Sequence, residues 1–279
     1  MVTVITINYN NREGLQRTLD SVRKQSVHEF EYIIVDGGST DGSRELIEEN
    51  RDIITEWVSE KDNGIYNAMN KGVAMASGDY CLFLNSGDVF HDPEVMHKVN
   101  ATPFDVDIVL GRVNNVAGGK IVEEYIPDEN ITLMHIFETG MHHAGSFIRT
   151  SLMEKYPYSE ALKVCSDREF FIRTIIDDNC SYRTLPFVVC DFEVGGASAD
   201  KCLLKQESLA IINSLYPPRL MDDFTASTLR IKEMTLQLVD CRGKIIKFIC
   251  GLNILILKLF KLILGSKMYV EPSMRNRKN

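Results

Sequence analysis

The sequence predicts an α/β protein with one Rossmann-like domain, a mixed central sheet and a C-terminal helical extension. Three observations lead to this prediction. Apolar segments of strand length alternate with helix-length segments over residues 1–90, the alternation becomes irregular over residues 91–216, and an apolar but basic segment ends the chain. Strands that alternate with helices are typical of βαβ units, which build a mainly parallel sheet with right-handed crossovers.

Four short runs rich in β-branched and aromatic residues are predicted to be buried strands. They cover residues 2–9, 30–35, 53–58 and 80–84. Apolar residues at helical spacing lie between these strands. The first predicted helix contains Leu15, Leu19 and Val22. The next two cover residues 41–50 and 64–76.

The second half of the chain mixes strands and helices without a regular order. Its predicted strands cover residues 107–112, 120–126, 145–149 and 183–194. Its predicted helices cover residues 166–176 and 199–216, and Pro217 and Pro218 end the second of them. We expect this half to extend the same sheet.

Charge is distributed unevenly along the chain. Residues 219–279 hold 12 Lys and Arg against 5 Asp and Glu, a net of +7, so residues 1–218 carry −15 of the total of −8. An acidic body disfavours nucleic acid as a partner, because nucleic-acid phosphates require a basic stripe. The seven cysteines are scattered and odd in number, without a Cys-x-x-Cys pair, which indicates a reducing cytoplasm and no zinc site. The first residues are strand-like and do not predict a signal peptide.

Polar side chains follow three of the predicted strands, at Tyr9 and Asn10, at residues 36–43 and at residues 85–88. In an open α/β sheet, ligands bind at the carboxyl ends of the strands. Asp88 there, beside Gly87, suits a divalent cation that holds a phosphate, although a simple turn acid is the alternative. The Gly-rich segment 36–43 has neither a GxGxxG nor a Walker pattern.

A series of motifs in this order resembles the inverting family 2 glycosyltransferases, which have the glycosyltransferase A fold. They are Thr-Ile-Asn-Tyr-Asn (6–10), Val-Asp-Gly-Gly-Ser-Thr-Asp-Gly-Ser (35–43), Ser-Glu-Lys-Asp-Asn-Gly-Ile-Tyr-Asn-Ala-Met-Asn-Lys-Gly (59–72), Ala-Ser-Gly-Asp-Tyr (76–80), Leu-Asn-Ser-Gly-Asp (84–88), His-His-Ala-Gly (142–145) and Cys-Ser-Asp-Arg-Glu-Phe-Phe (165–171). These motifs are most similar to those of the transferases that take part in the synthesis of bacterial surface polysaccharides, such as colanic acid, O-antigen and capsule.

The resemblance implies a hexosyltransferase-type enzyme that uses a nucleoside-diphosphate sugar, by default a UDP-sugar. The sugar would pass, with inversion, to a hydroxyl of a polysaccharide or lipid-linked oligosaccharide. Residues 1–216 would form the catalytic domain, with a donor half over 1–90 and an acceptor half over 91–216, and residues 217–279 a helical tail. The alternative is a non-catalytic nucleotide-sugar-binding or carbohydrate-binding protein of the same fold.

The resemblance also implies a set of donor-binding residues. Tyr9 would pack against the base with Asn10 nearby, although Tyr9 could instead be a core residue at a strand end. Asp36 would accept a hydrogen bond from the base. Asp41 would contact the ribose or cap the next helix, and Lys71 would face the diphosphate or remain a solvated helix charge. The remaining donor-side residues are Asn85, Ser86 and Gly87.

Asp88 matches the last acid of the family's metal-binding motif, which implies bound Mg²⁺ or Mn²⁺ that neutralises the departing nucleoside diphosphate. The sequence departs from the family here. Asn85 and Gly87 stand where acids are common, and so does Gly37. One carboxylate would then hold the metal, which Mg²⁺ tolerates when substrate phosphates complete its coordination.

Asp167 matches the family's catalytic base, which takes the proton of the acceptor hydroxyl. The alternative is an acid favoured by the dipole at a helix N-terminus. His142 and His143 would shape the acceptor side or approach the diphosphate, although a histidine is more often structural.

The segment 244–264 is the most apolar part of the chain, with lysines that form a narrow stripe at helical spacing. Its longest uncharged run has ten residues, half of the roughly 20 that a spanning helix needs. We expect an interfacial helix on the inner face of the cytoplasmic membrane. The alternative is a helix packed on the catalytic domain or on a second subunit in a homodimer.

Overall fold

The structure is a computed structural model, and it describes residues 1–196, 200–220, 222, 223 and 226. The chain divides into two compact units, Met1–Ile212 and Asn213–Asn279, and everything below concerns the first. The expected tail helix at residues 244–264 lies outside the described residues. Within the described part, no helix is both long and apolar enough to cross a bilayer.

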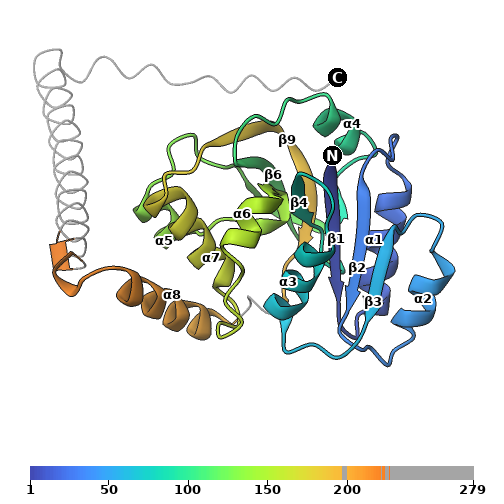
Figure 1. The fold of residues 1–279 in the computed structure, drawn as a ribbon, viewed down its shortest axis with the longest axis horizontal. Helices are drawn as coiled ribbons and strands as arrows, with labels where there is room; N and C mark the ends of the chain where they lie inside the picture. The colour runs from blue at the N-terminus through green and yellow to red at the C-terminus, as the bar shows by residue number, and fades with distance from the viewer. Residues whose placement is uncertain (197–199, 221, 224–225, 227–279) are drawn as a thin grey trace, which may run out of the picture. The chain divides into compact units, whose positions relative to one another are not determined.

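The first half forms a parallel sheet with the order β3-β2-β1-β4 (Figure 1). Its strands are β1 (Val2–Asn8), β2 (Glu31–Asp36), β3 (Glu56–Ser59) and β4 (Tyr80–Phe83). Every residue of β1, β2 and β4 is buried, which explains their nearly continuous apolar sequences, because a parallel sheet is covered on both faces. The third strand begins later than predicted, because residues 51–53 form a turn.

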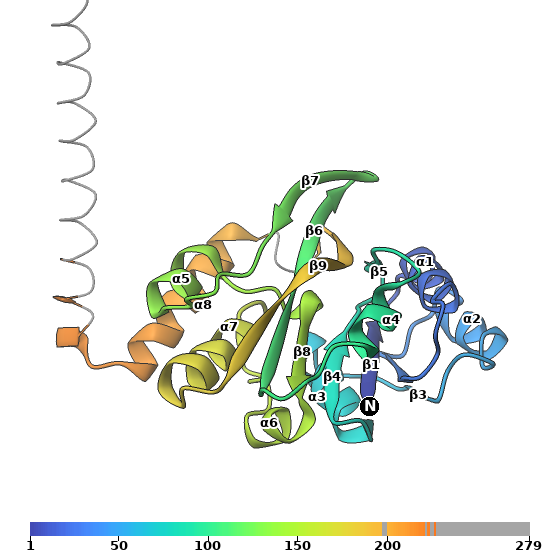
Figure 2. The ribbon, with the colours of Figure 1, turned by 90° about the horizontal axis from the view of Figure 1, so that it is seen from above.

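Helices α1 (Arg12–Arg23) and α2 (Ser43–Glu49) lie on one face of this sheet, and α3 (Ile65–Met75) lies on the other (Figures 1 and 2). The side chain of Asn11 caps α1 by accepting the Gly14 N–H. On the opposite face, α3 approaches the sheet at Gly72, where a Cβ would lie 2.5 Å from Ile5 Cγ2. Helices therefore cover both faces of this sheet.

The second half continues the same sheet with mixed strand directions, as predicted. The strand β8 (Ser146–Arg149) runs antiparallel to β4, and β6 (Ile108–Ala117) lies between β8 and β9 (Tyr182–Glu193). The short β5 (Val89–Phe90) pairs with β9, and β7 (Lys120–Tyr125) forms a hairpin with β6. The sheet has nine strands among the described residues.

Several short helices surround this half, and most of them have too few residues to give a helical periodicity in the sequence. They are α4 (Val95–Asn100), α5 (Leu133–Thr139), the 3₁₀ turn η1 (His143–Gly145) and α6 (Thr150–Lys155). The helix predicted over residues 166–176 consists of α7 (Ser166–Phe171) and a π-helical turn, η2 (Ile172–Asp177). The Thr174 hydroxyl donates to the Phe170 carbonyl, the oxygen that an α-helix would use for the Thr174 N–H. Helix α8 covers Lys201–Leu215.

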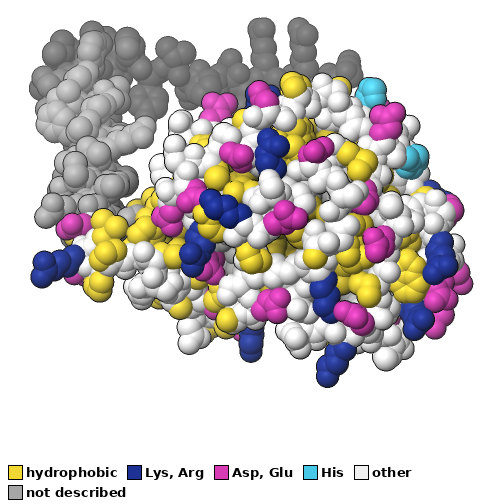
Figure 3. Space-filling view, viewed as in Figure 1, with side chains coloured by type: hydrophobic (Ala, Val, Ile, Leu, Met, Phe, Trp, Pro, Cys, Tyr) yellow, Lys and Arg dark blue, Asp and Glu magenta, His cyan; other side chains and the backbone are white. Residues whose placement is uncertain are grey.

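On the face shown in Figure 3, acidic and basic side chains of the described residues are interspersed. This arrangement differs from the continuous basic stripe that a nucleic-acid-binding face would present.

Candidate active site

A cavity of about 1250 Å³ lies at the carboxyl ends of β1, β2 and β4. Both halves of the domain line it. Tyr9, Gly37, Asn85 and Asp88 come from the first half, whereas His143 and Asp167 come from the second. The cavity therefore lies where the strand-end rule predicts a ligand site, and the second half closes it from the other side.

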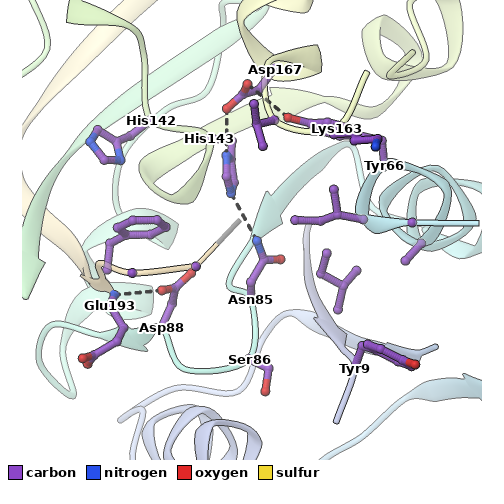
Figure 4. Close-up of a pocket in the computed structure, with 18 of the residues that line it drawn as sticks. Tyr9, Tyr66, Asn85, Ser86, Asp88, His142, His143, Lys163, Asp167 and Glu193 are labelled. Atoms are coloured by element: carbon purple, nitrogen blue, oxygen red, sulfur yellow. Dashed lines mark hydrogen bonds and ion pairs between the residues drawn. The ribbon is translucent and has the colours of Figure 1, made fainter. Parts of the chain in front are cut away.

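Seven of the twelve residues proposed from the sequence line this cavity. They are Tyr9, Asn85, Ser86, Asp88, His142, His143 and Asp167 (Figure 4). The other five lie around it and contribute no lining atoms. They are Asn10, Asp36, Asp41, Lys71 and Gly87.

The loop after β4 is held in place by α1. The Thr18 hydroxyl donates to the Asp88 carbonyl over 2.8 Å and accepts the Gly87 N–H over 3.0 Å. The Asn11 side chain donates to the Ser86 carbonyl over 3.0 Å. Gly87 has φ +109°, a conformation that side chains with a Cβ rarely adopt. Gly87 therefore shapes the turn that presents Asp88.

Asp88 is buried, with 4% of its surface exposed. Its Oδ1 accepts the Glu193 N–H over 3.1 Å, but its Oδ2 has no hydrogen-bond partner. Burial raises the pKa of this carboxyl to about 7, although the Glu193 N–H and nearby His143 oppose the shift. A buried carboxylate oxygen without a partner fits a cation, which would supply the missing charge.

No group of three or more His, Cys, Asp or Glu side chains in the described residues could hold a metal ion. Asp88 is therefore the one predicted metal ligand that the cavity provides. An ion bound there would have to take its other ligands from substrate oxygens or water, as Mg²⁺ does in many phosphate sites.

His143 lies between Asp167 and Asn85 (Figure 4). Its Nδ1 is 3.1 Å from Asp167 Oδ2, and its Nε2 is 3.1 Å from Asn85 Nδ2. Burial lowers the pKa of His143, but the hydrogen bond and charge of Asp167 outweigh burial, so the pKa is raised overall. Asn85 Oδ1 has no partner, so rotation of the amide would let it accept Nε2–H from a protonated ring.

Asp167 begins α7, where its Oδ1 accepts the Arg168 N–H over 2.8 Å. The hydroxyl of Tyr66, from the first turn of α3, lies 3.4 Å from the same oxygen. Burial, followed by the charge of Asp167, raises the pKa of Tyr66, so its hydroxyl stays protonated. Oδ2, which has only His143 Nδ1 as a partner, retains a further lone pair for a proton from a ligand.

His142 has a different environment from its neighbour. Its ring packs against Tyr125 and Phe192, with centroids 4.8 and 5.4 Å away. Burial lowers the pKa of His142 to about 4, and the neighbouring His143 acts in the same direction. His142 is therefore a neutral aromatic wall of the cavity at physiological pH.

Asp36 is fully buried, and its two oxygens accept hydrogen bonds from Asn8, Ser59 and both the N–H and the hydroxyl of Ser39. Burial raises its pKa, but these hydrogen bonds outweigh that effect and the pKa is lowered overall. Asp36 thus joins β1, β2 and β3 beneath the cavity. Each of its two oxygens already accepts two hydrogen bonds, so neither is free to accept one from a ligand.

Three further predicted residues have local partners. Asp41 accepts the Arg12 N–H at the start of α1, and it accepts the Ser43 N–H at the start of α2. This arrangement corresponds to the capping alternative. Asn10, with φ +47°, accepts the Thr40 N–H. Lys71 forms an ion pair of 2.7 Å with Glu60, which corresponds to the helix-charge alternative.

Sequence reasoning did not single out Asp62, Tyr66, Arg168 and Glu193, which all line the cavity. Asp62 and Tyr66 belong to the motif over residues 59–72, and Arg168 follows Asp167, so the motifs contained three of them. Their orientation depends on how α3, α7 and β9 pack. No spacing rule in the sequence carries that information.

Comparisons with known proteins identify the family of this chain. The family model described as glycosyl transferase family 2 matches residues 3–141. An uncharacterised glycosyltransferase of Mycobacterium tuberculosis is 32% identical over 215 residues, which cover 72% of this chain and 78% of that protein. The poly(ribitol-phosphate) beta-N-acetylglucosaminyltransferase TarP of Staphylococcus aureus is 26% identical over 231 residues, which cover 77% and 71%.

The solved structure of residues 1–349 of S. aureus TarS with UDP-GlcNAc superposes with a TM-score of 0.60 at 22% identity. The match covers 71% of this chain and 60% of that one, so this chain spans less than two thirds of that structure. This similarity shows a shared glycosyltransferase A fold. The chain belongs to glycosyl transferase family 2, and it is a glycosyltransferase.

Proposed function

We propose that this enzyme moves a sugar, with inversion, from a nucleoside-diphosphate sugar to a hydroxyl of a polysaccharide or lipid-linked oligosaccharide. One observation carries the proposal: Asp88 and Asp167 line the same cavity from opposite halves of the domain, and His143 lies beside both. This arrangement provides one acid for the leaving diphosphate and one for the attacking hydroxyl. A purely binding protein would not need the second acid.

The donor half binds the nucleotide in this proposal. Tyr9 is 66% exposed in the cavity, so its ring offers a free face on which a base can stack. Asn85 and Ser86 lie between Tyr9 and Asp88 and face the sugar-diphosphate. UDP is the donor nucleotide that we favour, and the match to TarS with UDP-GlcNAc supports this choice at the level of the fold.

Asp88 would hold Mg²⁺ or Mn²⁺ together with the donor diphosphate. A divalent ion there stabilises the negative charge that develops on the leaving diphosphate. The unpaired Asp88 Oδ2 is the group of this chain that would bind it. The ionised form of Asp88 is needed for this role, because a protonated carboxyl cannot ligate a cation.

Asp167 would act as the general base. The acceptor oxygen attacks the anomeric carbon on the face opposite the diphosphate, the bond to the phosphate oxygen breaks, and Asp167 takes the hydroxyl proton. The Nδ1–H of His143 and the Arg168 N–H hold the carboxylate in place. His142 and Phe192 line the cavity and form the aromatic wall against which a sugar ring could pack, and Tyr125 packs against the His142 ring.

The acceptor in this proposal is defined by its class of molecule, which is a surface polysaccharide or its lipid-linked precursor. The name of TarP, a poly(ribitol-phosphate) beta-N-acetylglucosaminyltransferase, supports a polymer acceptor. The basic, apolar tail over residues 219–279 would bring the enzyme to the inner face of the membrane where such precursors are assembled.

The decisive experiment is a panel of UDP-, GDP-, dTDP- and CDP-sugars, tested for thermal stabilisation and slow hydrolysis with Mn²⁺ or with EDTA. We expect one donor to raise the melting temperature and to be hydrolysed only when the metal is present. Nucleotide binding without any turnover, with acceptors included, would favour the non-catalytic alternative. Failure of every nucleotide to bind would refute both functions.

A further inference from the structure

The loop before α3 places a free carboxylate oxygen beside Tyr9. An ideal Cβ built on Gly37 would lie 2.3 Å from Asp62 Oδ2 and 3.1 Å from Tyr9 Cδ2. The Asp62 carboxylate therefore occupies the space into which a side chain at position 37 would project. Asp62, Gly37 and Tyr9 all line the cavity.

The two oxygens of Asp62 have different environments. Oδ1 accepts the Gly64 N–H over 3.0 Å, which fixes the side chain. Oδ2 accepts no hydrogen bond from any described residue. Asp36, the acid expected at the base from the sequence, has both oxygens occupied by donors from Asn8, Ser39 and Ser59. At this end of the cavity, Asp62 is thus the carboxylate that can accept from a ligand.

We propose that Asp62 selects the nucleobase of the donor: its Oδ2 accepts the N–H at the centre of the Watson–Crick edge of uracil or guanine. This inference rests on the proposed function, because it assumes a nucleotide stacked on Tyr9. A carboxylate is an acceptor only. Uracil N3–H and guanine N1–H are donors, whereas cytosine N3 and adenine N1 are acceptors that would face the carboxylate with like partial charge. The site therefore takes uridine or guanosine nucleotides and discriminates against cytidine and adenosine nucleotides.

The test compares binding of UDP, GDP, CDP and ADP by calorimetry with Mg²⁺ present, for the wild type and for Asp62→Asn. Asparagine has nearly the same shape, and its Oδ1 can still accept the Gly64 N–H, so Nδ2 takes the place of Oδ2. We expect the wild type to bind UDP or GDP at least about 10-fold more tightly than CDP, since a charge-assisted hydrogen bond is lost with cytosine. In Asp62→Asn the preference should disappear or reverse, because Nδ2–H can donate to cytosine N3.

Glu60→Gln is the matched control. Glu60 is an acid of the same loop, but it pairs with Lys71 and does not line the cavity, so its removal should leave the nucleotide preference unchanged. Gly37→Ala is a second probe with Asp62 intact. Its Cβ would displace the Asp62 carboxylate and should reduce the same preference.

Three results would overturn the inference. An unchanged preference in both Asp62→Asn and Gly37→Ala would remove Asp62 from base selection. An equal loss of affinity for all four nucleotides would place Asp62 at the ribose or in the fold. Failure of the wild type to bind any nucleotide would refute the proposed function as well, which separates that failure from the other two.

Discussion

Asp167 Oδ2 lies 3.1 Å from Nδ1 of His143, whose other ring nitrogen faces Asn85. Asn85 belongs to the same loop as Asp88, so one partly buried ring connects the proposed base with the loop that carries the proposed metal ligand. His143 has its pKa raised by Asp167, against the effect of burial. The His143 ring therefore fixes the Asp167 carboxylate and can share its charge through the hydrogen bond between them.

His143 is expected to act as a positioning residue. Replacement His143→Ala should lower kcat by about 100-fold, because a displaced base costs this much when its geometry is lost. His143→Gln should recover part of the rate, since its amide N–H can still donate to Asp167. The donor Kd, measured by calorimetry, should change little in both variants. A wild-type rate in His143→Ala would show that Asp167 needs no support from this ring.

Asp167→Asn should retain donor affinity and lose transfer. Asparagine has nearly the same size and can still hydrogen-bond an acceptor, but it cannot take a proton. General-base assistance contributes about 10²–10⁴-fold, so the loss should appear in kcat. Glu169→Gln is a suitable control, because Glu169 pairs with Arg173 and does not line the cavity. Turnover of Asp167→Asn within a few-fold of the wild type would exclude the base role.

Asp88→Asn should abolish transfer and the metal-dependent part of donor binding. The variant removes the charge that would hold the metal at the diphosphate. Excess EDTA should bring the wild type to the level of the variant in a radiolabelled transfer assay. Because burial raises the Asp88 pKa from 3.8 to about 7, the stability of the wild type falls as pH rises from about 4 to 7, and the loss is complete above 7, so metal-free Asp88→Asn should not melt below the wild type at pH 8. Full activity in EDTA would contradict the metal role.

His142 should make the wild type sensitive to acid. Burial lowers its pKa to about 4, whereas the unfolded chain has the ordinary value of 6.5. Between these values the unfolded state binds a proton that the folded state does not, so stability is complete above pH 6.5 and falls as pH decreases towards 4. In urea titrations, His142→Phe should gain about 2 kcal/mol relative to the wild type between pH 8 and pH 5. A difference independent of pH would show that His142 is not buried as a neutral ring.

Removal of residues 243–279 should release the protein from anionic vesicles and leave donor binding intact. The expectation rests on the net charge of +7 over residues 219–279 and on the apolar composition of the tail. Flotation with anionic and with neutral vesicles measures it, and donor affinity is the control. If the intact chain does not float with anionic vesicles, the tail has another partner, such as a second subunit.

The strand ends and the two acids at the cavity could be predicted from the sequence. Asp88 follows a short buried strand and Asp167 lies in a recognisable motif, and both depend on local sequence alone. The mixed sheet was also predictable from the irregular second half. The short strand β5 and the short helices around residues 95–100 and 133–139 were not, because two to seven residues carry too little periodicity.

The roles of the loop acids depend on tertiary contacts. Asp36 has a suitable position at the end of β2, yet its oxygens are occupied by Asn8 from β1, Ser39 from its own loop and Ser59 from β3. Three segments distant in sequence must meet for this to occur. The sequence shows that position 37 is a glycine. The fold was needed to show that the Asp62 carboxylate occupies the space that a side chain there would fill.

The antiparallel pairing of β4 with β8 joins the two halves of the sheet, with Tyr80, Cys81 and Leu82 opposite Arg149, Ile148 and Phe147. These paired residues belong to one uninterrupted hydrogen-bonded ladder, so the halves cannot swing apart as hinged lobes do without breaking backbone hydrogen bonds. Any closure over a bound donor must therefore come from surface loops. Crystals grown without substrate should consequently tolerate soaking with a nucleotide, because the framework between the two acids stays rigid.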